Sequence, residues 1–440
     1  MAMAPELVTA TAAVPLEAPG PSGAPDRPGR TDFLTRRTIP LLGSAVFAVV
    51  AVNYALWWVP TVNHVDSWWV PGDFWINYFG ASAFVHGHWA TMYALHTRLN
   101  TLPGVFVLLS PAVLIAQALH LSLGAPYTAI STPTTWLALE PCALLAASVV
   151  LFSLDALARR LEVGVRRRAV LMAAEVVALW DLLAMQWHPE DALAVAFAVW
   201  GLLAAFDGRW RRSGWLFGLG IACQPLAVMA LAGVVALAPR RSALGILVRA
   251  GVPGALLIAG PLIANPSGTL RGVFAEEGRL ISVADHPTPW MHFAPHLGGG
   301  LVAAGPARMG AVIAAVVVGW TVCRRTRRPE LVVWVVALCF ALRTLFESVM
   351  VAYYIWPALA LALVAAARAS RVRFAVAGAA SSFATAFALL GWQNAWAWWS
   401  VLVACLAAVL VAAWPAPRPR FQPTAGPLAG RSHLAPSGAP

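Results

Sequence analysis

Long apolar stretches recur along this chain and constrain its fold more than any other feature. A helix needs about 20 apolar residues to cross the hydrocarbon core of a bilayer. Stretches of about that length lie at 38–59, 136–158, 169–187, 190–206, 246–264, 306–323, 330–349, 351–367, 374–390 and 395–414. Only 11% of the residues are charged, compared with about 25% in soluble domains. The sequence therefore predicts an all-α, polytopic membrane helical bundle with about ten full spans.

Arginine clusters separate these stretches and predict the orientation of the helices. Short loops rich in Lys and Arg face the cytoplasm in most membrane proteins. The clusters lie at 36–37, 159–160, 166–168, 209–212, 240–241, 324–328, 368–373 and 418–420. We assign all of them to the cytoplasm, together with both termini. The net charge of +11 is then a topology signal and does not indicate nucleic-acid binding.

Two further apolar stretches conflict with this orientation if each crosses the bilayer once. A single crossing by 214–238 would put its flanking arginines on opposite sides, so we predict a helical hairpin broken near Gln224-Pro225. A single crossing by 101–121 would likewise send 159–168 outside. We therefore expect 101–121 to belong to the external region, dipping in and out of the membrane around Ser110-Pro111.

This topology divides the chain into three parts. Residues 1–37 and 415–440 are rich in Ala, Pro and Gly, and we expect both to be disordered cytoplasmic tails. The N-terminal tail lacks the features of a cleaved secretory signal. Residues 38–414 form the membrane domain, in which 60–135 and 265–305 are external loops, the first with interfacial helices. The five cysteines lie in or at the end of apolar stretches and indicate neither disulfides nor a metal site.

Most acidic and histidine residues outside the cytoplasmic loops then lie on the external side. Asp73 opens a stretch with apolar and aromatic residues at helical spacing, so it lies near the N-terminus of an interfacial helix. There it is either a helix cap or a catalytic carboxylate, and the spacing favours the two equally. The simplest interpretation of Asp66 is a solvated loop carboxylate.

The turn "HPED" at 188–191 carries three ionisable groups between two predicted spans. Proline followed by acidic residues is typical of a helix start. However, His188, Glu190 and Asp191 together exceed what a cap needs, and ionisable groups at a membrane are functional candidates by default. Both interpretations stay open.

Arg343 lies about two-thirds of the way across the bilayer from Glu330, too deep to be an orientation signal. It pairs with Glu347, four residues later on the same helix face, or it binds a phosphate group through its guanidinium. The histidines lack HExxH or another ligand spacing, so the sequence predicts no metal site.

Four segments occur in an order that resembles a known family. They are "GDFWINYFGASAFVHGHWATMY", "LPGVFVLLSPAVLIA", "GWLFGLGIACQPLAVMALAGVVAL" and "RTLFESVMVAYYIWPALALAL", and together they touch most of residues 38–367. Their order is similar to the GT-C superfamily of integral-membrane glycosyltransferases. The closest resemblance is to glycosyltransferase family 87, the polyprenyl-phosphate-mannose-dependent type found in actinobacteria.

The resemblance implies an inverting transferase of the plasma membrane that needs no cofactor. It would move a sugar, expected to be mannose, from a polyprenyl-phosphate donor to a lipid or cell-envelope glycan acceptor at the outer face. Asp73 matches the general base, which takes the proton of the acceptor hydroxyl. Arg343, Tyr353 and Tyr354 match the residues that bind the donor phosphate. The remaining candidates for substrate binding are Asp66, His86, His188, Glu190, Asp191 and Gln224.

Three departures from the family pattern keep two alternatives open. "NTLPG" replaces paired prolines, Gln224 stands where lysine is common, and the local sequence "MVAYY" lacks a histidine beside the tyrosine pair. A transporter or flippase also uses broken helices and buried charges, although the two halves of this chain show no pairing of the kind that transporters have. An inactive scaffold for envelope enzymes is the other alternative.

Overall fold

The computed structural model describes residues 30–63, 68–94, 99, 101–124, 133–275, 279–280, 286–293, 296–297, 301–302, 305–326, 328–347, 349–389 and 394–415. The chain divides into two units at Thr38. Of the first unit only residues 30–38, the start of helix α1, are described. The predicted tails therefore lie almost entirely outside the described residues. The features below belong to the second unit, residues 39–440.

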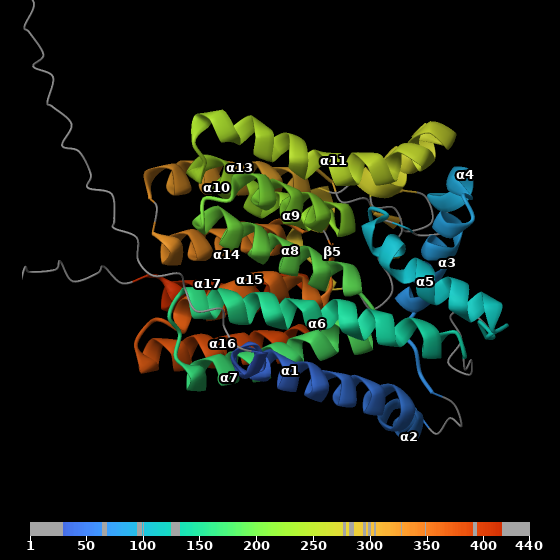
Figure 1. Cartoon of the computed structure of the whole chain (residues 1–440), viewed down its shortest axis with the longest axis horizontal. Coiled ribbons are helices and arrows are strands. Elements are labelled where there is room, and N and C mark those ends of the chain that lie inside the picture. The colour runs from blue at the N-terminus through green and yellow to red at the C-terminus, as the bar shows by residue number, and fades with distance from the viewer. Residues whose placement is uncertain are drawn as a thin grey trace, which may run out of the picture. The chain divides into compact units, whose positions relative to one another are not determined.

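Helices make up most of the described chain (Figure 1). The first half contains α1 (Arg30–Asn53), α2 (Val59–Asn63), α3 (Asp73–Val85), α4 (Trp89–Met92), α5 (Gly104–Ala118), α6 (Trp136–Arg160), α7 (Val165–Leu179) and α8 (Pro189–Phe206). The second half contains α9 (Trp210–Cys223), α10 (Val228–Leu237), α11 (Arg240–Ala264), α12 (Pro266–Leu270), α13 (Gly305–Arg325), α14 (Pro329–Phe346), α15 (Trp356–Ala366), α16 (Arg371–Ala388) and α17 (Ala395–Ala413). Short π or 3-10 turns extend or link them: η1 (Tyr54–Trp58), η3 (Trp180–Met185), η4 (Pro225–Ala227), η5 (Arg271–Ala275), η6 (Pro289–Phe293) and η8 (Ala352–Ile355).

Each predicted span coincides with a helix. Within the described residues, seven helices are long and apolar enough to cross a membrane. They lie in Arg37–Thr61, Trp136–Arg160, Pro189–Phe206, Arg240–Ala264, Ala307–Arg325, Pro329–Phe346 and Trp396–Ala413. The helices α7, α15 and α16, at the other three predicted spans, are outside this set. The prediction of a helical membrane protein is confirmed, and the count of ten spans stays a prediction.

Among the described residues, five strands of two residues each add a small departure from the all-α prediction. They are β1 (Arg279–Leu280), β2 (His286–Pro287), β3 (His296–Leu297), β4 (Leu301–Val302) and β5 (Val349–Met350). In the first sheet β4 pairs antiparallel with both β1 and β3, with Leu301 opposite Leu280 and Leu297. In the second, β2 pairs with β5, with His286 opposite Met350. The second pairing ties the predicted loop 265–305 to the end of α14.

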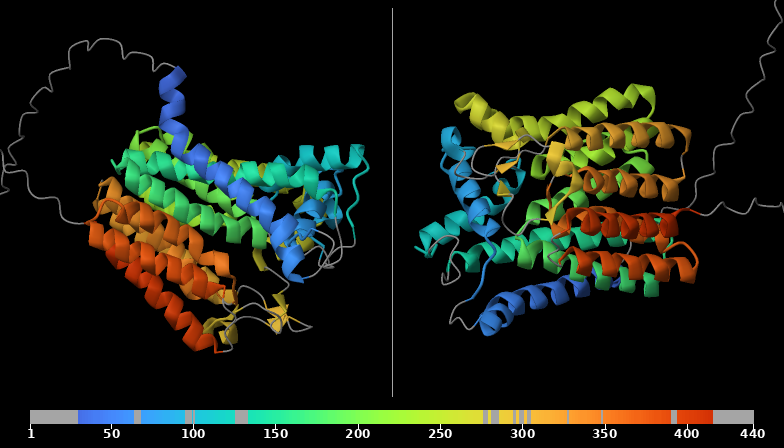
Figure 2. Two further views of the ribbon diagram at one scale, coloured as in Figure 1. Left: turned by 90° about the horizontal axis from the view of Figure 1, so that it is seen from below. Right: turned by 180° about the vertical axis from the view of Figure 1, so that it is seen from behind.

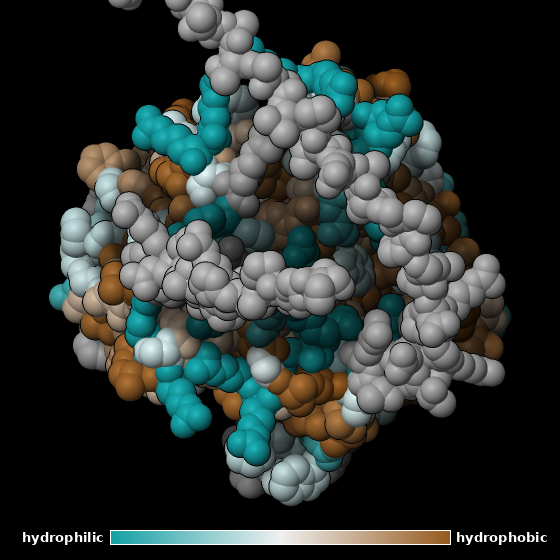
Figure 3. Space-filling model, turned by 60° about the vertical axis from the view of Figure 1, so that its left-hand side comes forward, coloured by the Kyte–Doolittle hydropathy of each residue, from teal (hydrophilic) through white to brown (hydrophobic). Residues whose placement is uncertain are grey.

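The predicted cytoplasmic loops gather at one end of the helices, which we call the arginine end (loops 159–168, 207–212, 238–241, 324–329 and 367–373). Arg160 lies 3.8 Å from Asp207 across two of these loops. Arg368 donates to the carbonyl oxygen of Leu161 over 2.6 Å across another two. Figure 3 shows hydrophilic residues gathered on this end, with hydrophobic residues around them. A common end is what the predicted orientation requires.

The predicted hairpin at 214–238 is confirmed. Close contacts pair Gly214 with Ile246 and Gly254 with Ala222, so α9 and α11 run in the same direction. Because α11 starts again at the arginine end, α10 has to return there from the break. Gln224 is extended at that break (φ −150°, ψ 125°), which is the conformation that a following proline favours.

Helix α5 lies away from the arginine end, as predicted for 101–121. Its Gly104 packs so closely on the end of α9 that an added Cβ would lie 2.4 Å from the carbonyl oxygen of Ala222. Figure 2 shows α3, α4 and α5, in blue to cyan, beyond the ends of the orange and red helices. The predicted interruption around Ser110-Pro111 is wrong, because the helix continues through Pro111. Proline removes one backbone donor, and the remaining turns of α5 keep the helix intact.

Burial separates the central helices from those that face lipid. All of α15 is buried, and 78% of the span in α8 is buried. In contrast, only 22% of the spans in α11 and α13 is buried. Their exposed side chains include Leu256 and Ile263, at 71% and 82% exposure. Apolar side chains exposed in such numbers indicate surfaces in contact with lipid.

Candidate functional site

The turn between α7 and α8 has an unusual backbone. It follows the π-helix η3, and Trp187 adopts φ of 60° in the left-handed region. Such a conformation costs a bulky residue about 1–3 kcal/mol and is common at functional sites; π-helical turns are enriched there too. Trp187 is held by a 2.7 Å hydrogen bond from its Nε1 to Glu140 on α6 and by an edge contact with Phe74 on α3. The strained backbone thereby fixes the next residue, His188.

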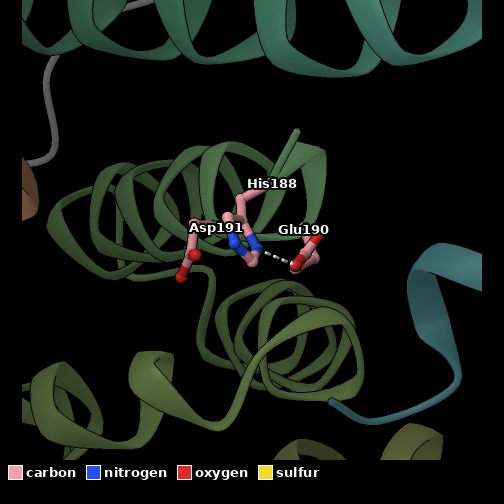
Figure 4. A group of neighbouring side chains, drawn as sticks. All are labelled: His188, Glu190 and Asp191. Atoms are coloured by element: carbon pink, nitrogen blue, oxygen red, sulfur yellow. Dashed lines mark hydrogen bonds and ion pairs between the residues drawn. The ribbon is translucent and has the colours of Figure 1, made fainter. Parts of the chain in front are cut away.

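His188 lies between two carboxylates. Its Nε2 is 2.7 Å from Oδ2 of Asp73, and its Nδ1 is 2.6 Å from Oε1 of Glu190. Figure 4 shows the second of these contacts, with Asp191 on the other side of the ring. Because Asp73 begins α3 and Glu190 belongs to the first turn of α8, the imidazole joins the start of α3 to the "HPED" turn. The structure therefore brings Asp73 and the turn 188–191 together.

Asp73 is the first residue of α3, and Gly72 occupies the cap position. The carboxylate contacts His188, so the interpretation of Asp73 as the helix cap does not hold. Its side chain is 30% exposed, compared with 1% for Glu190. Asn77, one turn later, donates to the backbone oxygens of Asp73 and Trp187 over 3.1 and 3.3 Å. This amide holds the start of α3 against the α7–α8 turn.

A chain of aromatic contacts leads from His188 to Arg343. The imidazole ring lies 4.6 Å from the ring of Tyr353, which meets Tyr354 edge-on at 4.9 Å. The guanidinium carbon of Arg343 lies 4.1 Å from the centre of the Tyr354 ring, a cation–π distance. The charge of Asp191 also acts on Arg343. Residues from the start of α3, the α7–α8 turn and the end of α14 thus form one cluster.

The ion pair predicted for Arg343 is present. Its Nε lies 3.3 Å from Oε2 of Glu347. Arg308 on α13 also binds this carboxylate, with its Nε 2.9 Å from Oε1. Two guanidinium groups therefore contact one carboxylate in this part of the cluster. An ion pair with Glu347 therefore does not exclude a phosphate ligand for Arg343.

The part of the cluster around His188 is rich in acidic groups. Burial lowers the pKa of His188, but the charges of Glu190 and Asp73 and the hydrogen bonds to both outweigh it and raise that pKa to about 10. The ring is therefore positively charged at neutral pH and offsets one carboxylate. Glu190, Asp191 and Asp181 are all at most 3% exposed, and the charge of Asp181 also acts on His188. Among the described residues, the acidic groups around His188 outnumber its single charge.

Three of these side chains offer a set of metal-ligand atoms. One nitrogen of His188 and one oxygen each of Glu190 and Asp191 lie within 4.8 Å of one another. The sequence predicted no metal site because its histidines lack HExxH or another ligand spacing. Here the ligands come from residues on either side of Pro189, where the chain changes from turn to helix.

Three predicted site residues lie elsewhere or cannot be placed. His86 follows the C-terminal end of α3, about 20 Å along the helix from Asp73 at about 1.5 Å per residue. There it is exposed and pairs with Gln117 over 3.0 Å. Gln224 lies at the hairpin break, next to Cys223, on which the charge of Glu190 acts. Asp66 lies outside the described residues.

Several residues of the site were not singled out from the sequence, among them Asn77, Glu140 and Asp181. Asn77 looks like an ordinary polar residue of an amphipathic helix, and no pattern marks it. Glu140 and Asp181 lie inside predicted spans, and a carboxyl group there is a functional candidate by default. This rule applies to both residues, so both could have been identified from the sequence.

Comparisons with known proteins identified no relative of this chain. No model of a known protein family matches the chain, and no characterised protein matches it either. The function is therefore inferred from the geometry of this cluster and from the resemblance of the four sequence segments.

Proposed function

We propose that this protein is a membrane glycosyltransferase with its site at the extracytoplasmic face of the plasma membrane. It transfers a sugar, expected to be mannose, from a polyprenyl phosphate to a hydroxyl group of a lipid or cell-envelope glycan. In this topology both termini are cytoplasmic. The observation that carries the proposal is the single cluster in which Asp73, held by His188, and the cation Arg343 lie at the end of the helices opposite the arginine end.

Asp73 is the general base in this reaction. Asp73 and Glu190 both contact His188, and the side chain of Asp73 is more exposed than either of the other two. An acceptor hydroxyl can therefore approach Asp73. His188 donates a hydrogen bond to the carboxylate, which keeps it ionised and fixes its direction. The acceptor oxygen attacks the anomeric carbon and its proton passes to Asp73. The bond from that carbon to the phosphate oxygen breaks on the opposite face, which inverts the sugar.

Arg343 stabilises the leaving group. Polyprenyl phosphate gains negative charge as the glycosidic bond breaks, and a guanidinium donates two parallel hydrogen bonds to phosphate oxygens. The two guanidinium groups that meet at Glu347 suit that role. Tyr354 holds the guanidinium against its ring, and Tyr353 separates this cation from His188. Base and cation therefore lie on two sides of the tyrosine pair.

A groove beside the cluster suits the hydrocarbon chain of the donor. It measures about 600 Å³, lies between α1 and α7, and is lined only by apolar residues from 39–50 and 169–180. One end is formed by Trp180, whose neighbour Asp181 acts electrostatically on His188. An isoprenoid chain along this groove would have its phosphate at the end that carries the cluster.

The test is transfer of radiolabelled mannose from a polyprenyl phosphate in proteoliposomes that contain the purified full-length protein. Asp73→Asn should lower the rate by about 10²–10⁴-fold, the usual contribution of a general base. Asp207→Asn is the matched control, because that carboxylate is 45% exposed at the arginine end. Full activity of Asp73→Asn would remove the proposed base. Uptake of a lipid-linked sugar without any transfer would favour the transporter alternative.

A further inference from the structure

We propose that His188, Glu190 and Asp191 bind a divalent metal ion beside Asp73. Their three ligand atoms lie within 4.8 Å of one another, on the first turn of α8 and the residue before it (Figure 4). These distances place all three within reach of one ion once the side chains close around it, since such bonds are about 2.0–2.2 Å long.

The second observation is a buried oxygen atom. Oε2 of Glu190 is inaccessible to solvent and has no hydrogen-bond partner among the described residues, although Oε1 of the same group contacts His188. A buried ionised carboxylate is costly unless it is paired or binds a metal. Asp191 lies beside it at 3% exposure, so two carboxylates share a site of low polarity. A divalent cation would give the buried Oε2 of Glu190 a partner.

The position of Asp73 fits the outer ligand sphere of such an ion. A histidine that binds a metal through one ring nitrogen nearly always donates the other N–H to a carboxylate or carbonyl. With Nδ1 of His188 toward Glu190 and the ion, Nε2 would donate to Asp73 over the observed 2.7 Å. Binding replaces the proton on Nδ1 and releases it.

The kind of donor narrows the choice of ion. One imidazole nitrogen and two carboxylate oxygens suit Zn²⁺ or Mn²⁺, whereas Ca²⁺ and Mg²⁺ prefer oxygen ligands alone. Three protein ligands also leave an open coordination position. If the proposed function holds, an acceptor hydroxyl beside Asp73 can take that position. Only this last step depends on the proposed function; the binding of the ion does not.

The experiment measures the binding of Mn²⁺, with no substrate added, to the purified full-length protein in lipid nanodiscs. The free ion is followed by electron paramagnetic resonance. We expect one bound ion per chain and an affinity at least about 10–100-fold lower in Glu190→Gln, because even the loss of an outer-shell partner costs that much. Glu162→Gln is the matched control, because that side chain is 81% exposed at the arginine end, and its affinity should equal that of the wild type. Equal binding by all three proteins would mean an adventitious ion only and would overturn the proposal, as would no binding.

A second measurement covers the case in which Glu190→Gln fails to fold. Pulsed resonance on the wild type should show one imidazole nitrogen coupled to the bound Mn²⁺, and its absence would overturn the proposal. The metal site and the proposed function can also be disproved independently of each other. Sugar transfer by a protein that binds no Mn²⁺ or Zn²⁺ contradicts the metal site alone, and specific binding without transfer contradicts the proposed function alone.

Discussion

Asp155→Ala should lower the free energy of unfolding by about 3–5 kcal/mol. The Asp155 side chain is fully buried between α6 and α7, and it accepts two hydrogen bonds from Arg168 over 2.7 and 2.9 Å. The Arg168 side chain is itself only 11% exposed. Removal of the carboxylate leaves this guanidinium buried without its bidentate partner, and breaking a buried pair in that way costs about 3–5 kcal/mol. The helices α6 and α7 also hold the turn at His188, so this pair supports the site from the arginine end.

The control is an ion pair at the same end of the molecule that is exposed. Asp207 and Arg160 lie 3.8 Å apart with side chains 45% and 47% exposed, and Asp207→Ala should cost less than about 1 kcal/mol. The assay is unfolding of the protein in mixed micelles by added SDS, followed by circular dichroism. The double variant Asp155→Leu/Arg168→Met should recover most of the loss, because apolar residues replace both charges. A loss for Asp155→Ala no greater than that for Asp207→Ala would contradict this prediction.

Three further predictions concern the site and its supports. Asn77→Leu removes the bonds to the backbone at Asp73 and at the α7–α8 turn, so it should cost about 1–3 kcal/mol of stability and slow mannose transfer in the proteoliposome assay. Ala173→Trp fills the groove between α1 and α7 and should raise KM for the lipid donor, whereas Ala379→Trp on exposed α16 should leave KM unchanged. Gly218→Val puts a Cβ 2.5 Å from a backbone oxygen of α11 and should cost about 1–3 kcal/mol in SDS unfolding; Gly310→Val, in open space, should cost less.

The fold could be predicted from the sequence where one physical rule dominates. Hydrophobic length fixed the helices, and the arginine clusters predicted which helix ends share a side. The hairpin at 214–238 followed from the same rule, since only a return at Gln224 keeps its flanking arginines together. The interruption at Pro111 was predicted from local sequence alone. It failed because a proline costs a helix one hydrogen bond, and packing of α5 on α3 and α6 outweighs that loss.

The site could be predicted in part. Asp73, His188 and Arg343 could be singled out because the chain has few charged residues. An ionisable group in or beside a membrane is costly and is therefore a functional candidate. The contacts among them could not be predicted, since they depend on the left-handed backbone of Trp187 and on α3 folding back against the α7–α8 turn. His86 was included for its residue type, and the 13-residue length of α3 carries it away from the cluster.

The most direct test of the account is the side of the membrane on which the cluster lies. His88→Cys and Arg212→Cys, each in a chain without its five native cysteines, put exposed thiols near α3 and at the arginine end, respectively. Intact cells are treated with a maleimide that cannot cross the membrane. We predict labelling of the first variant in intact cells and of the second only after permeabilisation. The reverse pattern would place Asp73 in the cytoplasm and contradict the proposed extracytoplasmic transferase.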